Sequence, residues 1–340
     1  MRRKQIFECN NNIFNVTDTL RPSPDKQFAK ETDNMAKHNM AFLYGRVSKA
    51  PIINMNRETG DYYYGMVYLD TIRGTRPIDD GVKFAKHDHP LIMSRDKVFI
   101  DMMRNWKEND IIFVKGVVTS KALVKSSFCP ECKDSEGKST RNEVKSNLIY
   151  ITPIYMKKVA EYDNKNDATD DLMENREISN QVWTIGTLIK DPRFFKTKDN
   201  IPITQYLIAL NRKFRNPNDS EEIVTDWPIV KSYGEMALED KVRLHQGSEI
   251  YIDGFLQART VRRKIKCKCC GQLYEFKDHA MEIVPYAIEY LTGFVSNQEI
   301  EEERKTTIEQ IKQSIFDKKE SMSEAEKEIM TSDDVKTEEE

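Results

Sequence analysis

Two pairs of cysteines have a spacing suited to metal binding. The first pair stands in the sequence CPEC and the second in CKCC. A Cys-x-x-Cys turn lets two thiolates meet one metal ion, and a closed structural zinc site needs four ligands. Because each pair supplies two, the sequence predicts one structural zinc ion shared by Cys129, Cys132, Cys267 and Cys270.

A second arrangement uses the later pair alone. Cys267, with Cys269 or Cys270, and His279 would then form a local site, although the first pair has no corresponding histidine. Reduced thiols without metal are a third possibility, and a disulfide is a fourth that a reducing compartment disfavours. If four thiolates do hold zinc, no position stays open for a water molecule, so the metal is structural.

Basic residues interleaved with rings form a second group that points to a polyanion. Single strands of nucleic acid are held by cations that follow the phosphates and by aromatic faces that stack on bases. In the sequence NRKFRN the ring of Phe214 is surrounded by cations. The candidate cations are Arg212, Lys213, Arg215, Arg259, Arg262, Arg263 and Lys264 in the later part of the chain, and Arg73, Lys121 and Lys125 in the earlier part.

The elements that position these residues occur twice, because the chain contains an internal repeat. The sequence AFLYGRVSKAP parallels VWTIGTLIKDP, DHPLI parallels DWPIV, and IIFVKGVVTSK parallels EIYIDGFLQAR. Cys129 and Cys132 lie as far beyond Gly116 as Cys267 and Cys270 lie beyond Gly254. Two copies of one module explain this agreement, and the polar stretch between them is typical of a linker.

Each copy has the periodicity of strands interrupted by one helix. Segments such as YYYGMVYLD and ITQYLIALN alternate large apolar residues with smaller or polar ones. The helices are expected at 93–106 and 234–245, the second with Met236, Leu238, Val242 and Leu244 on its apolar face. Three strands, a helix and two more strands are typical of the OB fold, a five-stranded Greek-key barrel.

The predicted fold class is therefore mostly β, with two OB barrels in tandem. The expected divisions are an N-terminal extension at 1–38, a first barrel at 39–158, a linker at 159–179, a second barrel at 180–294 and an acidic, partly helical tail at 295–340.

The second copy resembles bacterial single-stranded DNA-binding proteins. The sequences VWTIGTLIKDPRFF, YLIALNRKFRN, VTDWPIVKSYGEMA and GSEIYIDGFLQART carry the resemblance in this order. It implies base stacking on Phe214, Trp227 and Tyr233, while a fourth aromatic position of the family is filled by Val261. The first copy looks like a more divergent member of the same family, with His89 in place of the tryptophan and Arg95 in place of the tyrosine, so we expect its binding to be more electrostatic.

Charge separates the chain into a basic body and an acidic tail. Residues 296–340 hold fifteen acidic and seven basic side chains, which leaves a net charge of +5 on the preceding residues. A basic body is suited to a polyanion and an acidic tail is not. The resemblance implies that such a tail recruits replication or repair proteins, and that the protein is a homo-oligomer, here a dimer.

Several classes of protein are not expected. The sequence contains no phosphate-binding glycine loop and no nucleophile beside a base, so we expect no enzyme. Neither a membrane span nor a secretion signal is expected, and a cytoplasmic location follows. The sequence favours non-specific binding of single-stranded DNA during replication, recombination or transfer. An OB-fold RNA or tRNA binder, or a replication-restart accessory protein, is the alternative, because the fold alone does not choose.

Overall fold

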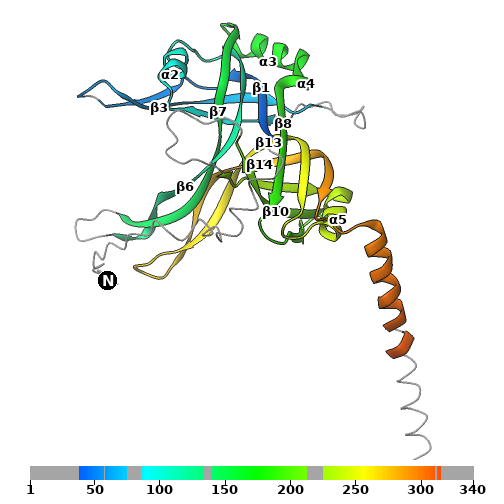
Figure 1. Ribbon diagram of the computed structural model, residues 1–340. Helices are drawn as coiled ribbons and strands as arrows, with labels where there is room; N and C mark the ends of the chain where they lie inside the picture. Colours follow the sequence, from blue (N-terminus) through cyan, green and yellow to red (C-terminus); the bar gives the residue numbers. More distant parts are fainter. Residues whose placement is uncertain are drawn as a thin grey trace, which may run out of the picture. The chain divides into compact units, whose positions relative to one another are not determined.

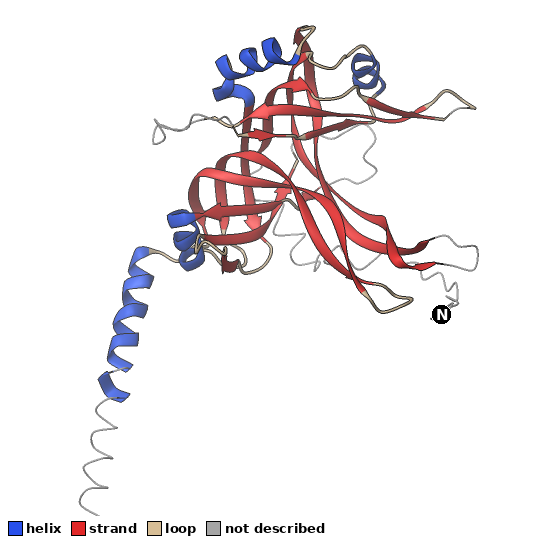
Figure 2. Cartoon of the chain, turned by 180° about the vertical axis from the view of Figure 1, so that it is seen from behind, coloured by secondary structure: helices blue, strands red, loops and turns tan. Residues whose placement is uncertain are grey.

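The computed structural model describes residues 38–56, 58–74, 86–133, 139–212, 225–310 and 312–314 (Figure 1). Strands dominate them (Figure 2). The first part contains β1 (His38–Val47), β2 (Ile52–Met55), β3 (Tyr62–Ile72), β4 (His87–Asp88), β5 (Leu91–Ser94), α2 (Lys97–Arg104), β6 (Ile111–Lys133) and β7 (Ser139–Ala160). The second part contains α3 (Lys165–Glu174), α4 (Arg176–Ser179), β8 (Asn180–Leu188), β9 (Arg193–Lys196), β10 (Pro202–Asn211), β11 (Thr225–Asp226), β12 (Ile229–Tyr233), α5 (Gly234–Arg243), β13 (Glu249–Lys266) and β14 (Leu273–Thr292).

Each half of the sheet closes into a five-stranded barrel. In the second barrel β8 pairs with β10, β10 with β12, β12 with β14, β14 with β13, and β13 returns to β8. The pairing of β12 with β14 is parallel and the others are antiparallel. In the first barrel β1, β3, β5, β7 and β6 close in the same order, again with one parallel pair. The prediction of two OB barrels is confirmed.

The glycines that anchor the repeat lie where strand four bends. The pairing register shifts at Gly116 in β6 and at Gly254 in β13. A Cβ atom at Gly116 would lie 2.5 Å from the carbonyl oxygen of Thr152, and one at Gly254 would lie 2.4 Å from that of Val284. Only glycine tolerates so close a backbone approach at a bulge.

The two barrels are joined edge to edge. β1 pairs antiparallel with β8 along six residues, from His38 opposite Ile185 to Leu43 opposite Asn180. The buried apolar residues of both barrels form one cluster, which includes Leu43 and Ile112 from the first and Tyr206 and Ile252 from the second. The barrels therefore share one continuous sheet.

The segment between the barrels is helical and packed. Ala168 and Leu172, one turn apart on α3, are fully buried beside Tyr44 of β1. The Tyr44 hydroxyl donates a 2.7 Å hydrogen bond to Asp171, and the Ile72 amide donates one to Ser179 at 2.9 Å. The polar composition of this stretch reflects its solvent face, while one apolar stripe docks on the first barrel.

The helices inside the barrels differ in detail from the prediction. In the first barrel 91–94 is strand β5, and α2 begins after Asp96, whose side chain caps the Val98 amide. In the second barrel Leu238 and Val242 are exposed, and α5 turns Ala237 and Asp240 inward instead. The predicted apolar face of α5 was therefore wrong at these two positions.

Two long hairpins extend from the barrels as the strand four to strand five connections. β6 with β7 and β13 with β14 continue well past the barrel strands and run alongside each other (Figures 1 and 2). Residues 119–150 and 258–282 contain thirteen Lys and Arg against seven Asp and Glu. We call these two segments the hairpin arm. The excess positive charge of the body is concentrated here.

Residues 294–340 form a separate unit. Its described part includes a helix over 297–310. Ser296 accepts a hydrogen bond from the Glu299 amide at 3.2 Å, and Glu299 accepts one from the Ser296 amide at 2.7 Å, a reciprocal cap for the helix start. Across the described ranges, the helices lack the combination of length and apolar composition that crossing a membrane requires.

Candidate nucleic-acid interface and cysteine cluster

The four predicted cysteine ligands come together between the two hairpins. The sulfur atoms of Cys129, Cys132, Cys267 and Cys270 all lie within 4.8 Å of one another. Cys129 lies 3.7 Å from Cys270, and Cys132 lies 3.5 Å from Cys267. In a tetrahedral site with Zn–S distances of about 2.3 Å, neighbouring sulfur atoms are about 3.8 Å apart. The cluster therefore fits a tetrahedral metal, and the five described cysteines are free thiols.

The local arrangement with His279 is not formed. His279 pairs with Thr260 on the hairpin, whereas the cysteine turn follows Lys266, which pairs with Leu273. Six rungs at about 3.3 Å each place this histidine about 20 Å along the ribbon from the turn. The long antiparallel ribbon thus separates residues that are close in the sequence.

Hydrogen bonds to sulfur surround the cluster. Asn142 from β7 is buried, donates to the Cys267 sulfur at 3.4 Å and accepts from the Lys268 amide at 3.0 Å. Burial raises the pKa of Cys267, but bonds from the Cys270 amide, Asn142 and the Cys269 amide outweigh it and lower this pKa to about 6. Donors around sulfur stabilise thiolates, the form that binds metal. No pattern in the sequence marks Asn142 for this role.

Asp278 ties the hairpins together further along. Its side chain is fully buried and pairs with Lys125 from β6 and with Arg263 at 2.9 Å. Ser146 from β7 donates to it at 3.0 Å. Burial raises the pKa of Asp278, but Lys125 and Ser146 oppose that effect and the pKa is lowered. Two of the predicted DNA-binding cations, Lys125 and Arg263, are therefore held between the hairpins.

Three predicted residues gather where the barrels meet. Tyr233, which ends β12, is 37% exposed and its hydroxyl donates to Gln257 at 3.3 Å. Burial and the Glu282 carboxylate raise the pKa of Tyr233, and the charges of Arg259 and Arg73 oppose the rise. Arg73 comes from the first barrel and Arg259 from the second. The structure thus places an exposed ring near cations from both barrels.

Trp227 is partly buried and lies between β11 and β12, just before the third strand of the second barrel. Its amide donates to the Ser120 hydroxyl of β6 at 2.7 Å, and its carbonyl accepts from Asn147 at 3.2 Å. Both partners belong to the first barrel. The backbone around this ring is therefore fixed by the neighbouring hairpin.

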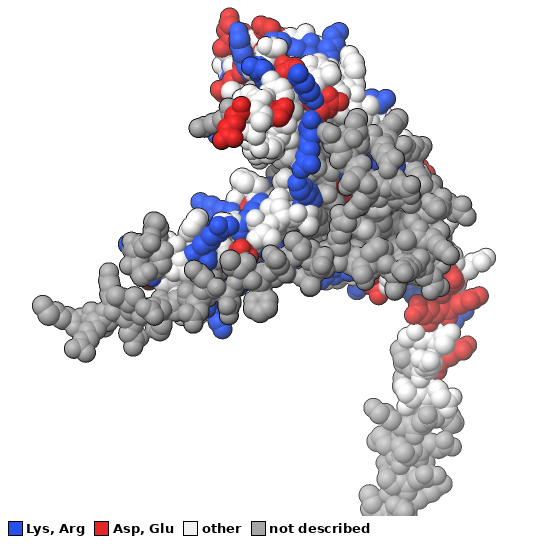
Figure 3. Space-filling view, turned by 60° about the vertical axis from the view of Figure 1, so that its left-hand side comes forward, with Lys and Arg blue, Asp and Glu red and all other residues white. Residues whose placement is uncertain are grey.

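The remaining candidates have varied surroundings. Arg212 pairs with the buried Asp226, and Arg262 is 68% exposed beside Glu275 at 3.5 Å. Lys121 and Lys264 are exposed. Lys213, Phe214 and Arg215 lie outside the described residues. Figure 3 shows Lys and Arg side chains running from the first barrel toward the hairpins on one face of the molecule.

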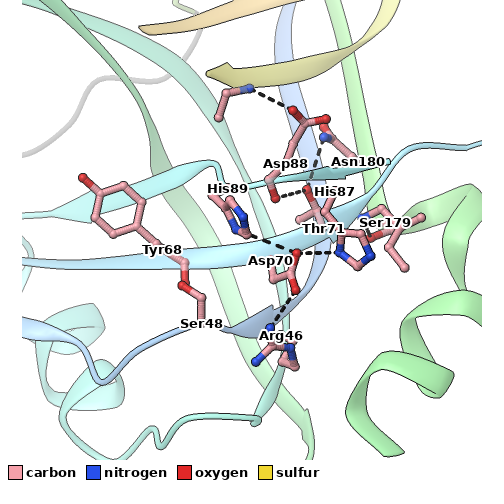
Figure 4. A network of polar contacts seen from close by, with 12 residues as sticks. Arg46, Ser48, Tyr68, Asp70, Thr71, His87, Asp88, His89, Ser179 and Asn180 are labelled. Atoms are coloured by element: carbon pink, nitrogen blue, oxygen red, sulfur yellow. Dashed lines mark hydrogen bonds and ion pairs between the residues drawn. The ribbon is translucent and has the colours of Figure 1, made fainter. Parts of the chain in front are cut away.

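His89 belongs to a polar network in the first barrel that sequence reasoning missed (Figure 4). Asp70 is 4% exposed, pairs with Arg46 at 2.7 Å and contacts His87 at 2.8 Å and His89 at 3.7 Å. Burial raises the pKa of Asp70, but hydrogen bonds from His87 and Arg46 outweigh it and the pKa is lowered. The same bond from Asp70 raises the pKa of His87 against its burial.

The two closed five-stranded barrels, joined through β1 and β8, define a tandem OB-fold protein. Residues 179–268 match the model of the Single-strand binding protein family. The second barrel is therefore similar to this family, in agreement with the resemblance seen in the sequence.

Relatives of known name match the same region. A single-stranded DNA-binding protein of Aquifex aeolicus (strain VF5) is 30% identical over 77 residues, covering 23% of this chain and 52% of the relative. Single-stranded DNA-binding protein 2 of Chlorobaculum tepidum (strain ATCC 49652 / DSM 12025 / NBRC 103806 / TLS) is 33% identical over 82 residues, covering 24% and 55%. The chain thus spans about half the length of these two relatives.

Solved structures with similarity include the wild-type single-stranded DNA-binding protein from Thermus aquaticus. That match has 15% identity and a TM-score of 0.45, and it covers 76% of this chain and 95% of the other. A deletion mutant of the same protein gives a TM-score of 0.46. The OB assignment rests on the strand order of the barrels themselves.

Proposed function

We propose that this chain binds single-stranded DNA without sequence preference and protects it during replication, recombination or transfer. The observation that carries the proposal is the exposed ring of Tyr233, whose hydroxyl bonds to Gln257 two residues before Arg259 on β13, an arginine that is 42% exposed beside Glu282. OB folds bind oligonucleotides on the face of strands two and three and on the adjoining loops. Tyr233 ends the third strand of the second barrel and therefore lies at this face. Rings supply stacking and cations supply phosphate contacts.

A titration tests this function. The protein is mixed with oligo-dT and with a duplex of equal length at two salt concentrations, and intrinsic tryptophan fluorescence is followed. We expect tight binding of dT, weakening with salt because phosphate contacts release counterions. Trp227→Ala and Tyr233→Ala should each weaken binding about 5- to 150-fold, the equivalent of about 1 to 3 kcal/mol per stacked base. Equal affinity for duplex and dT would overturn the proposal.

We also propose that the four clustered cysteines hold one structural zinc ion. Its support is the fit of the sulfur spacing to a tetrahedron and the donors around Cys267. Bound there, zinc would supply a cross-link between the hairpins rather than a reactive centre, because four thiolates fill its coordination. Cys129, Cys132, Cys267 and Cys270 would be the ligands.

Metal analysis of protein purified without chelator tests the zinc site. One zinc per chain is expected, and Cys267→Ser should reduce it by at least half. Cys269→Ser is the matched control, since Cys269 borders the cluster without belonging to the four. Metal-free wild-type protein, or equal loss in the Cys267→Ser and Cys269→Ser variants, would show that this assignment is wrong.

The chain is further proposed to form a homodimer. On the outer side of the shared sheet, Phe42 of β1 and Trp183 of β8 pack with ring centres 5.2 Å apart, and both rings are only partly buried. An aromatic pair on a sheet face is suited to meeting the same pair of a second copy. Sedimentation should give a dimer for the wild type and a monomer for Phe42→Glu. A monomeric wild-type protein at micromolar concentration would contradict the proposal.

A further inference from the structure

The outward side of β3 in the first barrel carries aromatic and sulfur side chains. Along this strand Gly65, Val67 and Leu69 are buried, while Tyr64 and Met66 are partly buried and Tyr68 is 39% exposed. This alternation is that of a strand with one side in the core. Tyr68 therefore presents part of its ring on the outside of the barrel.

Tyr68 lies on the part of the barrel where OB folds take oligonucleotides. β3 and β5 are strands two and three, and Tyr68 pairs with Leu91 of β5. The strand two and three face is the common oligonucleotide-binding face of the fold. In Figure 4 the Tyr68 ring points away from Asp70, and His89 lies on the same side of β3.

Comparison of the barrels shows that the ring has changed strands. In the first barrel the Leu69 amide donates to the Pro90 carbonyl at 3.1 Å, and in the second the Ile208 amide donates to that of Pro228 at 3.3 Å. These equivalent bonds align Tyr68 with Leu207 and His89 with Trp227. The first barrel has its large ring on strand two, whereas the second has it just before strand three.

The charge beneath this surface does not repel a polyanion. Asp70 contacts His89 at 3.7 Å, and its carboxylate is buried and paired with Arg46 and His87. His89, at 55% exposure, is the outermost of these groups. A phosphate would therefore meet an imidazole rather than a bare carboxylate.

From this geometry we infer that Tyr68, with His89 at its side, forms a base-stacking subsite in the first barrel. Its ligand is one unpaired nucleobase of a strand whose neighbouring phosphate contacts His89. The inference rests on the proposed binding of single-stranded DNA. It changes the expectation that the first barrel binds mainly through charge, because Tyr68 gives this barrel a ring of its own for base stacking.

The affinity of oligo-dT long enough to cover both barrels tests the subsite. Tyr68→Ala should weaken binding about 10-fold, within the range for loss of one stacked base. Tyr68→Phe keeps the ring and should bind within about twofold of the wild type. Val98→Ala, which trims a side chain 65% exposed on α2, controls for surface truncation. Thermal unfolding of each variant shows whether the barrel is intact.

A second readout maps contact directly. Oligo-dT containing 5-iodo-deoxyuridine is cross-linked by ultraviolet light, and cross-linked peptides are identified by mass spectrometry. A cross-link at Tyr68 is expected in the wild type, and the Tyr68→Phe variant should cross-link through the same peptide because it keeps the ring. If a Tyr68→Ala variant that folds binds like Val98→Ala and no cross-link maps to 62–72, the subsite is wrong.

The outcomes separate this inference from the proposed function. If wild-type protein binds dT and Trp227→Ala weakens that binding, but Tyr68→Ala does not, only the first-barrel subsite fails. If wild-type protein does not bind dT at all, the proposed function fails and the subsite fails with it.

Discussion

The carboxylate of Asp88 in the first barrel accepts a 3.0 Å hydrogen bond from the backbone amide of Ala258 in the second. Asp226 of the second barrel accepts the equivalent bond, at 2.7 Å, from the amide of Ser120 in the first. Each carboxylate is also paired with an arginine of its own barrel, Arg73 or Arg212. The repeated Asp of DHPLI and DWPIV thus fastens each barrel to the strand four of the other.

Because Asp88 takes part in this reciprocal contact, we expect its replacement to lower the free energy of unfolding substantially. Asp88→Ala would leave the Arg73 guanidinium, 20% exposed, without its partner. Breaking a buried pair in this way costs about 3 kcal/mol or more. Urea unfolding should show this decrease, whereas Asp101→Ala, at an ion pair whose groups are about half exposed, should change stability by less than about 1 kcal/mol. Equal effects of the two substitutions would refute the assignment.

Asp240 should make the protein less stable as the pH rises. Burial raises its pKa to about 6, against hydrogen bonds from Ser232, Tyr290 and Tyr206. A folded-state pKa above the unfolded value means that the folded form holds the proton more tightly. Stability is therefore lost between about pH 4 and pH 6 and stays lower above that range.

Asp240→Asn should remove this decline, because an amide does not ionise. The difference reaches up to about 3 kcal/mol for a shift of about two units. Thermal unfolding between pH 4 and pH 8 measures it. Glu235→Gln, at an exposed position in the first turn of α5, is the control. A wild-type profile that rises from pH 4 to pH 6 by the same amount as the Asp240→Asn profile would contradict the prediction.

His87 should add a second decline in stability at higher pH. Its hydrogen bond to Asp70 raises the pKa, against its burial. The stabilisation is then fully present below the unfolded pKa of about 6.5 and is lost as the pH rises through the folded pKa. His87→Gln should flatten the stability profile above pH 6.5, as measured by urea unfolding. An unchanged slope in this variant would show that the pair does not couple to folding.

Chelation should loosen the hairpin arm and spare the barrels. If zinc holds the cysteine cluster, its removal leaves the hairpins joined only by side-chain contacts such as those of Asp278 and Asn142. Amide hydrogen exchange in 122–133 and 261–272 should then accelerate at least tenfold, while β1 and β8 stay protected. Protein containing Cys267→Ser should exchange like the chelated wild type. Uniform acceleration over the whole chain would point to global destabilisation instead.

Much of the fold could be predicted from the sequence because the same pattern of strands, helix and glycines occurs twice in the chain. Gly116 and Gly254 mark the same bulge, and alternation in β3 and β10 fixes which residues face the core. The shared cysteine site followed from the same register, since each copy offers only half a site. The edge pairing of β1 with β8 was not predicted, because backbone pairing between modules leaves little trace in side-chain periodicity.

Site residues that depend on long-range contacts escaped prediction. Asn142 and Asp278 are ordinary polar residues in the sequence and gain their roles only where the hairpins meet. In the sequence Lys125 and Arg263 resemble solvent-exposed cations, whereas in the structure both pair with Asp278. Tyr68 was hidden for another reason: its ring alternates with core residues in a strand, so periodicity shows that it leaves the core but not what it meets outside.

The pairing of β1 with β8 joins two barrels that belong to one polypeptide, and this affects how their sequences can diverge during evolution. When two barrels come from identical subunits, every substitution occurs in both, and a ring lost from one is lost from its twin. Here both barrels are parts of one polypeptide, so each can be altered while the other keeps its original surface. Tyr68 of the first barrel aligns with Leu207 of the second, and Trp227 of the second aligns with His89 of the first, so the two surfaces already differ.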